Sequence, residues 1–175
     1  MLNTNGIRIA QDPDFVKRLA AFKPGFEVYL QFDSLRASVH KNLRGADLTR
    51  IRRDALEALE RESISTTLVV VVKRGQNDDE LGEIINYALQ WKCVRGITFQ
   101  PIQDAGRNEG FDPARDRFVL SDIRRRIIAA KTPFGAGDII PLPCNPESIA
   151  IGYALRSGSK IAPITSFFPK DMLVE

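Results

Sequence analysis

The sequence TTLVVVVKRGQNDDELGEIINYAL, residues 66–89, joins a β-rich run to an amphipathic stretch through a polar loop. The run Thr66–Val72 is almost continuously apolar and β-branched, which is typical of a parallel strand covered on both faces. The apolar residues after the loop recur at the spacing of one helix face, namely Leu81, Ile84, Ile85, Ala88 and Leu89. A strand that leads through a short loop into a helix predicts one βα unit of a parallel sheet.

The same alternation of strand and helix extends toward the N-terminus and beyond the quoted stretch. Short β-rich runs predict strands over Glu27–Phe32 and Gly96–Gln100, and a further strand is expected before Asn5. Asp12 and Asp47 are expected to cap two helices, with Pro13 at the first position of the earlier one. The apolar faces of these helices are Phe15, Leu19 and Phe22 in the first, and Ile51, Ala55, Leu56 and Leu59 in the second. We therefore predict an α/β fold, and periodicity leaves open whether the sheet is doubly wound or a part-barrel.

The pattern changes after Arg107, so we divide the chain into residues 1–107 and a C-terminal extension, residues 108–175. In the extension, Ser121–Lys131 reads as a helix and Asp138–Cys144 as an extended, proline-broken segment. Pro146–Arg156 is predicted to form a last helix.

The composition is that of an ordinary globular domain, with 43% hydrophobic and 27% charged residues and a formal net charge of +3. Two arginine clusters, residues 50, 52 and 53 and residues 124–126, lie in helix-like stretches with acidic neighbours. We interpret both as solvated helix faces. The alternative is an RNA-binding surface, which would show a steep salt dependence.

The two cysteines do not indicate a secreted disulfide scaffold. No apolar run approaches the roughly 18 residues that span a bilayer, and no signal-peptide pattern is present. We expect a reducing, cytoplasmic setting. Because the first residues read as the end of a strand, we also expect the natural start to lie upstream.

Polar residues gather where the predicted strands end, which is where parallel α/β folds bind ligands. Each has a plain structural alternative, since Asn5-Gly6 is a common turn pair and Asn77 or Asp78 could simply cap a helix. The single histidine, His40, is expected to be exposed in a loop. The polar residues at the strand ends are Thr4, Asn5, Gly6, Gln31, Asp33, Ser34, Lys73–Asn77 and Gln100.

Several of these segments resemble the radical S-adenosylmethionine (radical SAM) family, in particular its molybdenum cofactor biosynthesis protein A type. The resemblance is carried by Thr4-Asn5-Gly6 after a strand, YLQFDS at Tyr29–Ser34 and VKRGQNDDELGEII at Val72–Ile85. VRGITFQPIQDAGR at Val94–Arg107 and DIIPLPCNP at Asp138–Pro146 resemble a narrower branch, the archaeal pterin-methylating and tetraether-lipid-synthase-like proteins.

The resemblance implies a six-stranded (β/α) part-barrel, entered here at its third strand and therefore lacking the first two. It implies an enzyme that binds S-adenosylmethionine and a [4Fe–4S] cluster, and that cleaves S-adenosylmethionine reductively to a 5′-deoxyadenosyl radical acting on a small-molecule, lipid or pterin-type substrate. The CxxxCxxC loop that holds the cluster in this family is missing from the chain. We therefore expect the fragment alone to hold no catalytic cluster and to be inactive.

By position, the resemblance places Thr4, Asn5, Gln31, Asp33, Ser34, Lys73 and Gln100 around S-adenosylmethionine. Cys144 is a candidate ligand of an auxiliary cluster, because we expect it just before a helix N-terminus, which favours a thiolate; a packed, inert cysteine is the alternative. A non-redox α/β ligand-binding module is the competing interpretation of the whole chain. The first strand should form an edge that is exposed to solvent or paired with a second copy.

Overall fold

The chain forms two compact units, Met1–Ile102 and Gln103–Glu175, in a computed structural model that describes residues 1–102 and 110–173. The predicted division after Arg107 lies outside the described residues and stays a prediction. Each unit is described by itself below.

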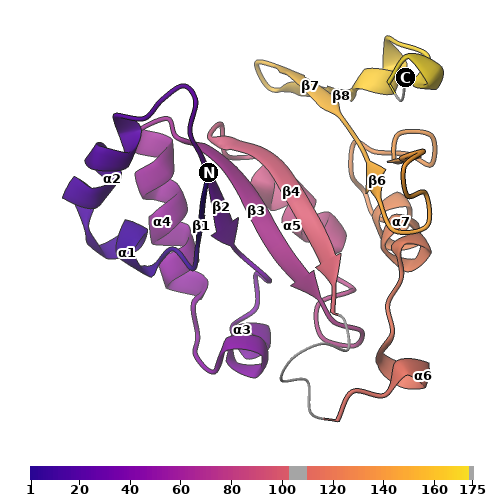
Figure 1. Cartoon of the computed structure of the whole chain (residues 1–175), viewed down its shortest axis with the longest axis horizontal. Coiled ribbons are helices and arrows are strands. Elements are labelled where there is room, and N and C mark those ends of the chain that lie inside the picture. Colours follow the sequence, from indigo (N-terminus) through magenta and orange to yellow (C-terminus); the bar gives the residue numbers. More distant parts are fainter. Residues whose placement is uncertain (103–109, 174–175) are drawn as a thin grey trace. The chain divides into compact units, whose positions relative to one another are not determined.

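The first unit is built on a four-stranded sheet whose spatial order is the chain order, β1-β2-β3-β4 (Figure 1). The strands are β1 (Leu2–Thr4), β2 (Glu27–Gln31), β3 (Ser65–Val72) and β4 (Val94–Pro101), and all neighbouring pairs are parallel. The predicted parallel α/β class is confirmed, and all four predicted strands are present. Within the described residues β1 pairs with β2 alone, so it is an edge strand.

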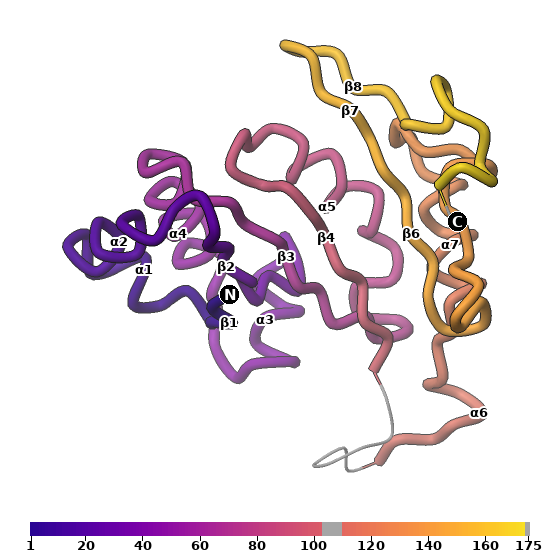
Figure 2. The backbone as a smooth tube through the Cα atoms, turned by 45° about the horizontal axis from the view of Figure 1, so that its top comes forward, coloured from indigo at the N-terminus to yellow at the C-terminus, as the bar shows by residue number. Residues whose placement is uncertain are grey.

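Helices connect the strands: α1 (Ile7–Gln11), α2 (Pro13–Ala20), α3 (Ala37–Arg44), α4 (Thr49–Arg61) and α5 (Leu81–Ala88). Figures 1 and 2 show α1, α2 and α4 grouped beside β1 and β2. No helix in the described ranges has both the length and the apolar character needed to cross a bilayer.

The predicted helix cap is confirmed at Asp12, whereas Asp47 lies one residue too early to be the N-cap of its helix. Asp12 is the N-cap of α2, and its carboxylate accepts a hydrogen bond from the Phe15 amide at 2.8 Å. Asp47 lies one residue before the N-cap of α4 and accepts from the Thr49 amide at 3.0 Å. The prediction for Phe22 was wrong: α2 ends at Ala20, so this ring lies past the helix and is 67% exposed.

One face of the sheet forms the core of the first unit. Val28, Leu30, Leu68, Val70 and Val72 are fully buried, as are the α4 and α5 residues Leu56, Leu59 and Ile84. The alternate residues Tyr29, Gln31, Val69 and Val71 are only partly buried. Because side chains alternate across a strand, the second face is the less covered one. The two faces of β3 are therefore unequally buried, whereas its continuous apolar run predicts a strand covered on both faces.

The second unit contains α6 (Pro113–Asp116), α7 (Leu120–Ala129) and two small antiparallel pairs. β5 (Ile140–Pro141) pairs with β6 (Ala150–Ile151), and β7 (Ala154–Ser157) pairs with β8 (Lys160–Pro163). Short 3₁₀ turns follow at Ile164–Ser166 and Lys170–Leu173. The helix predicted over Ser121–Lys131 is present as α7.

The prediction of a last helix over Pro146–Arg156 is wrong. The backbone makes one turn after Asn145 and then extends into β6 and β7. Figure 2 shows the β7–β8 hairpin that takes the place of the expected helix end. Gly158 has φ +60° and forms the two-residue hairpin loop with Ser159, between Ser157 and Lys160, which are paired. Gly158 therefore closes a hairpin and does not terminate a helix.

Candidate functional site

The β1–α1 turn is held by its own side chains. Thr4 Oγ1 accepts a hydrogen bond from the Gly6 amide at 3.1 Å, and Asn5 Oδ1 accepts from the Ile7 amide at 3.2 Å. Gly6 has φ +75°, and a Cβ atom there would lie 2.6 Å from Leu30 Cδ1. Glycine is required at this position by both backbone conformation and packing. Asn5 and Gly6 therefore do form a turn, and whether Asn5 also contacts a ligand stays a prediction.

Arg52 departs most clearly from the prediction made for the two arginine clusters. It was predicted to belong to a solvated helix face, yet it is 1% exposed. Its Nη1 donates to the Asn5 carbonyl, and its Nη2 lies 3.4 Å from the end of the Gln31 side-chain amide. Burial lowers the pKa of Arg52 to about 10, although the charge of Asp33 opposes this shift. The neighbours Arg50 and Arg53 do face solvent, and they pair with Asp54 and Glu57 one turn away.

Gln31 and Asp33 meet Arg44 at the end of β2. Arg44 Nε donates to Asp33 Oδ2 at 2.8 Å, and Nη2 donates to Oδ1 at 3.0 Å. With its amide oxygen turned toward Arg44, Gln31 accepts from Nη2 and Nη1 at 2.8 and 3.0 Å. In this orientation the amide nitrogen of Gln31 faces Arg52 Nη2, so Gln31 is hydrogen-bonded to Arg44 and not to Arg52. Gln31 therefore lies between two guanidinium groups.

Asp33 also terminates the pairing of β2 with β3. Its φ is +64°, which is uncommon for a residue other than glycine, and it is fully buried. Its Oδ1 accepts from the Val71 amide at 3.2 Å, in place of a strand carbonyl. Both carboxylate oxygens are therefore engaged by the protein itself.

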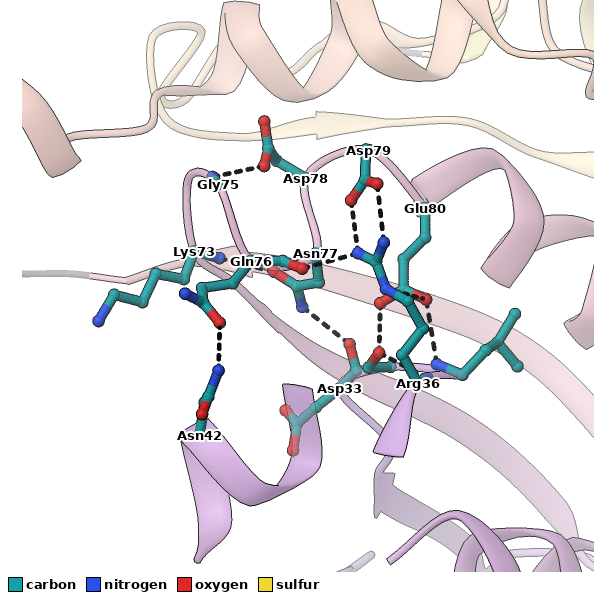
Figure 3. Close-up of polar contacts among 12 residues, drawn as sticks. Asp33, Arg36, Asn42, Lys73, Gly75, Gln76, Asn77, Asp78, Asp79 and Glu80 are labelled. Atoms are coloured by element: carbon teal, nitrogen blue, oxygen red, sulfur yellow. Dashed lines mark hydrogen bonds and ion pairs between the residues drawn. The ribbon is translucent and has the colours of Figure 1, made fainter. Parts of the chain in front are cut away.

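The β3–α5 loop is tied to the end of β2 by Asn77 (Figure 3). Asn77 is fully buried; its Nδ2 donates to the carbonyls of Asp33 and Val71, and its Oδ1 accepts from the Lys73 amide at 2.8 Å. The predicted alternative, a helix cap at Asn77 or Asp78, is wrong, because α5 begins at Leu81 with Glu80 as N-cap. Asp78 instead accepts from the Gly75 amide at 2.6 Å within the loop.

A second set of contacts, made by the buried carboxylate of Glu80, also joins the β3–α5 loop to the end of β2. Glu80 is 2% exposed, accepts a hydrogen bond from Ser34 Oγ, and accepts from the Leu35 amide at 3.2 Å. Burial raises the pKa of Glu80, although these hydrogen bonds oppose the rise. Arg36 bridges to the Asp79 carboxylate and to the Gln76 carbonyl at 2.7 Å (Figure 3).

His40 was predicted to be exposed in a loop, and this is wrong. It lies in α3 and is fully buried, with Nε2 2.7 Å from the Ser34 carbonyl. The helix was missed because its stretch, ASVHKNLR, carries a weak apolar pattern. His40 therefore fixes the backbone that follows β2.

The remaining predicted residues lie at the same edge of the sheet. Lys73 follows β3 and is partly buried; Figure 3 shows its side chain extending away from Asp79 and Glu80. Gln100 is exposed on β4 and is in register with Val71, the residue whose amide binds Asp33. The fold thus brings the ends of β1, β2, β3 and β4 together as expected for parallel strands. Whether these residues bind a ligand stays a prediction.

Cys144 belongs to the second unit, whereas the other predicted site residues lie at the strand ends of the first unit. It is exposed, and the helix expected to follow it is replaced by a turn and β6. The helix-dipole argument for a thiolate at Cys144 therefore fails. Cys93 is buried, and burial raises the pKa of its thiol to about 12. Among the described residues, no group of three or more histidine, cysteine or acidic side chains could hold a metal ion.

Sequence reasoning missed four residues that build the site: Arg36, Arg44, Arg52 and Glu80. A signal existed for Arg52, which is three residues before Ala55 and four before Leu56, on the apolar face of α4. For the others, the partners lie far away in the chain and leave no local pattern.

The chain is similar in sequence to two characterised enzymes, and no family model matches it. It is 37% identical over 124 residues to a 7,8-dihydro-6-hydroxymethylpterin dimethyltransferase of Methanocaldococcus jannaschii, a match covering 69% of this chain and 24% of the relative. It is 32% identical over 123 residues to a GTP 3',8-cyclase of Alkaliphilus metalliredigens, covering 69% of this chain and 36% of that enzyme. The chain thus spans only about a quarter to a third of the relatives it matches.

Proposed function

This chain is a relative of the radical SAM enzymes, and from that premise we propose that it forms part of the S-adenosylmethionine and substrate cradle of such an enzyme. The observation that carries the proposal is the convergence of polar residues from four parallel strand ends within one unit. In the family, reductive cleavage of bound S-adenosylmethionine supplies a radical that abstracts hydrogen from the substrate. The protein's part is to bind, orient and shield these molecules.

The residues at the strand ends divide into two roles in this proposal. Thr4, Asn5, Gln31, Lys73 and Gln100 are at least partly accessible and would contact the ligand. Hydroxyl, amide and ammonium groups are suited to a ribose diol and an amino acid carboxylate. Asp33 and Ser34 are buried and already hydrogen-bonded, so they would shape the cradle through Arg44 and Glu80.

The chain does not fit the iron–sulfur cluster. Its whole sequence contains only Cys93 and Cys144, and three cysteines are needed for the cluster of this family. Cys93 is also buried, with a raised thiol pKa that disfavours the thiolate a metal needs. The cluster would be supplied by the rest of a longer protein, and with it the first strands that would extend the sheet at β1 toward a part-barrel.

The substrate proposed for the longer protein is a small molecule of the pterin type. The dimethyltransferase relative acts, by its name, on a dihydropterin, and the aligned region covers most of this chain. A fused, polar heterocycle needs amide and hydroxyl partners on a partly open surface. The less covered face of the sheet offers Asn3 and Tyr29, which are paired across β1 and β2.

The proposal is tested on the full-length gene product, reconstituted anaerobically with iron and sulfide. We expect a [4Fe–4S] spectrum and reductant-dependent cleavage of S-adenosylmethionine. Gln31→Ala should weaken S-adenosylmethionine binding by roughly three- to tenfold, the range for one lost hydrogen bond. Lys17→Ala, at an exposed position of α2, should leave binding unchanged. A full-length protein that neither forms a cluster nor cleaves S-adenosylmethionine would refute the proposal and favour a non-redox binding module.

A further inference from the structure

Arg52 is buried, and no carboxylate of the part of the chain that the structure describes forms an ion pair with it. It is 1% exposed, and among the described residues its polar contacts are the Asn5 carbonyl and the neighbourhood of Gln31. No hydrogen-bond partner for its Nε is found within residues 1–102 and 110–173. A buried charge of this kind costs stability, and apolar side chains of similar size are often as good or better for folding. Stability alone therefore does not explain an arginine here.

The Arg52 guanidinium donates a hydrogen bond to the Asn5 carbonyl, which is not paired by the hydrogen bonds of β1 or α1. β1 ends at Thr4, and the first α1 bond is made by the Gly6 carbonyl, which accepts from the Ala10 amide at 2.9 Å. The Asn5 carbonyl lies between these two ladders and accepts from Arg52 Nη1. Because that carbonyl belongs to the Asn5–Gly6 peptide, Arg52 fixes the orientation of this peptide plane.

The same guanidinium packs against the turn. A Cβ atom on Gly6 would lie 3.8 Å from Arg52 Nη1, so the group lies directly beside the glycine. Thr4 and Asn5, whose side chains brace this turn, are two of the proposed ligand contacts. On its other side the guanidinium approaches Gln31, a third proposed contact.

We propose that Arg52 is a positioning residue, which holds the β1–α1 turn in the geometry that binds ligand. This inference depends on the proposed function for the identity of the ligand, S-adenosylmethionine. Arg52 itself acts through the Asn5–Gly6 peptide from beneath the turn, since its guanidinium is covered by protein.

The test compares Arg52→Met, Arg52→Lys and the control Arg53→Met. Methionine keeps much of the aliphatic length without the donors, and Arg53 is the exposed neighbour on the same helix, with a 71% exposed side chain. Hydrogen exchange of the Gly6 and Ile7 amides and the melting temperature are measured on this chain. S-adenosylmethionine binding is measured on the reconstituted full-length protein.

We expect Arg52→Met to melt close to the wild type while exchange at Gly6 and Ile7 rises by on the order of tenfold, as for one lost charge-assisted hydrogen bond. S-adenosylmethionine affinity should fall by a similar factor, Arg52→Lys should restore part of both effects, and Arg53→Met should change neither. Wild-type exchange and affinity in Arg52→Met would overturn the inference.

Two further outcomes keep the inference separate from the proposed function. If the wild-type protein does not bind S-adenosylmethionine, the proposed function fails, while the exchange measurement still tests Arg52. If Arg52→Met does not fold, Arg52→Lys decides, because one ammonium replaces the guanidinium fork: faster turn exchange than in the wild type supports the inference, and wild-type exchange overturns it.

Discussion

Asn77 Nδ2 donates hydrogen bonds to the carbonyls of Asp33 at 2.8 Å and Val71 at 2.7 Å, although Asp33 lies 44 residues away in the chain. Both amide hydrogens are used, and the amide oxygen accepts from Lys73. One buried side chain therefore joins the ends of β2 and β3 to the loop that precedes α5. The predictions below test the contacts that build this edge of the sheet.

Asn77→Asp should destabilise the chain by about 2–4 kcal/mol, because it replaces two buried donors with acceptors facing carbonyl oxygens. Chemical denaturation at neutral pH measures the effect. Asn42→Asp is the matched control, since Asn42 is exposed and donates a single bond to Gln76. Similar losses in the two variants would contradict the role given to Asn77.

Asp33→Asn should cost less stability than Asp33→Ala. Asparagine tolerates the positive φ of Asp33 and can still accept from the Val71 amide, whereas alanine loses that acceptor and adds roughly 1 kcal/mol of backbone strain. Both variants should lose the ion pair with Arg44. Denaturant midpoints of the two variants are compared, and an alanine variant as stable as the asparagine variant would show that this acceptor is not needed.

Gly6→Ala should destabilise the chain more than Gly45→Ala. Both glycines have positive φ, +75° and +77°, so both pay a similar backbone penalty of roughly 1–2 kcal/mol. Only at Gly6 would the new Cβ meet Leu30, at 2.6 Å, whereas nothing lies within 4 Å at Gly45. The difference in unfolding free energy between the two variants isolates the steric part. Equal values would exclude a tight contact at Gly6.

The contributions of Glu80 and Glu60 to folding stability should change with pH in opposite directions. Burial raises the pKa of Glu80, so the folded state binds this proton more readily than the unfolded state. Stability relative to Glu80→Gln should therefore rise as pH falls toward 4.5, the ordinary value.

Burial raises the pKa of Glu60, but hydrogen bonds from the Cys93 and Lys92 amides lower it by a larger amount. The pKa of Glu60 therefore lies below 4.5. Stability relative to Glu60→Gln is present above pH 4.5 and should be lost as pH falls through the lowered pKa. Denaturation of both pairs across the acid range measures the two slopes. Slopes of the same sign would contradict one of the two assignments.

Cys144 should react rapidly with a thiol reagent at neutral pH, and Cys93 should not. Cys144 is exposed, whereas Cys93 is buried and its thiol pKa is raised to about 12. In Cys144→Ser, fast labelling should disappear until the chain is unfolded, and Cys93→Ser should label as the wild type. Fast labelling in Cys144→Ser would show that Cys93 is accessible.

The sequence determined the elements whose pattern is local. The four strands and the helices α2, α4, α5 and α7 follow from runs of apolar residues at strand or helix spacing and, for α2, from the capping aspartate Asp12. Where the local pattern was ambiguous, prediction failed: Pro146–Arg156 has helix-compatible residues, but Gly152 lies inside it and Gly158 allows the hairpin with Lys160.

The tertiary structure alone decided which polar groups are buried and which partners they have. Asn5 and Arg52 are 47 residues apart, and Ser34 and Glu80 are 46 apart. Such distances become contacts only after parallel pairing brings the strand ends together. A buried polar group must then find a partner within hydrogen-bond reach, and that requirement depends on spatial proximity, which local sequence spacing does not encode.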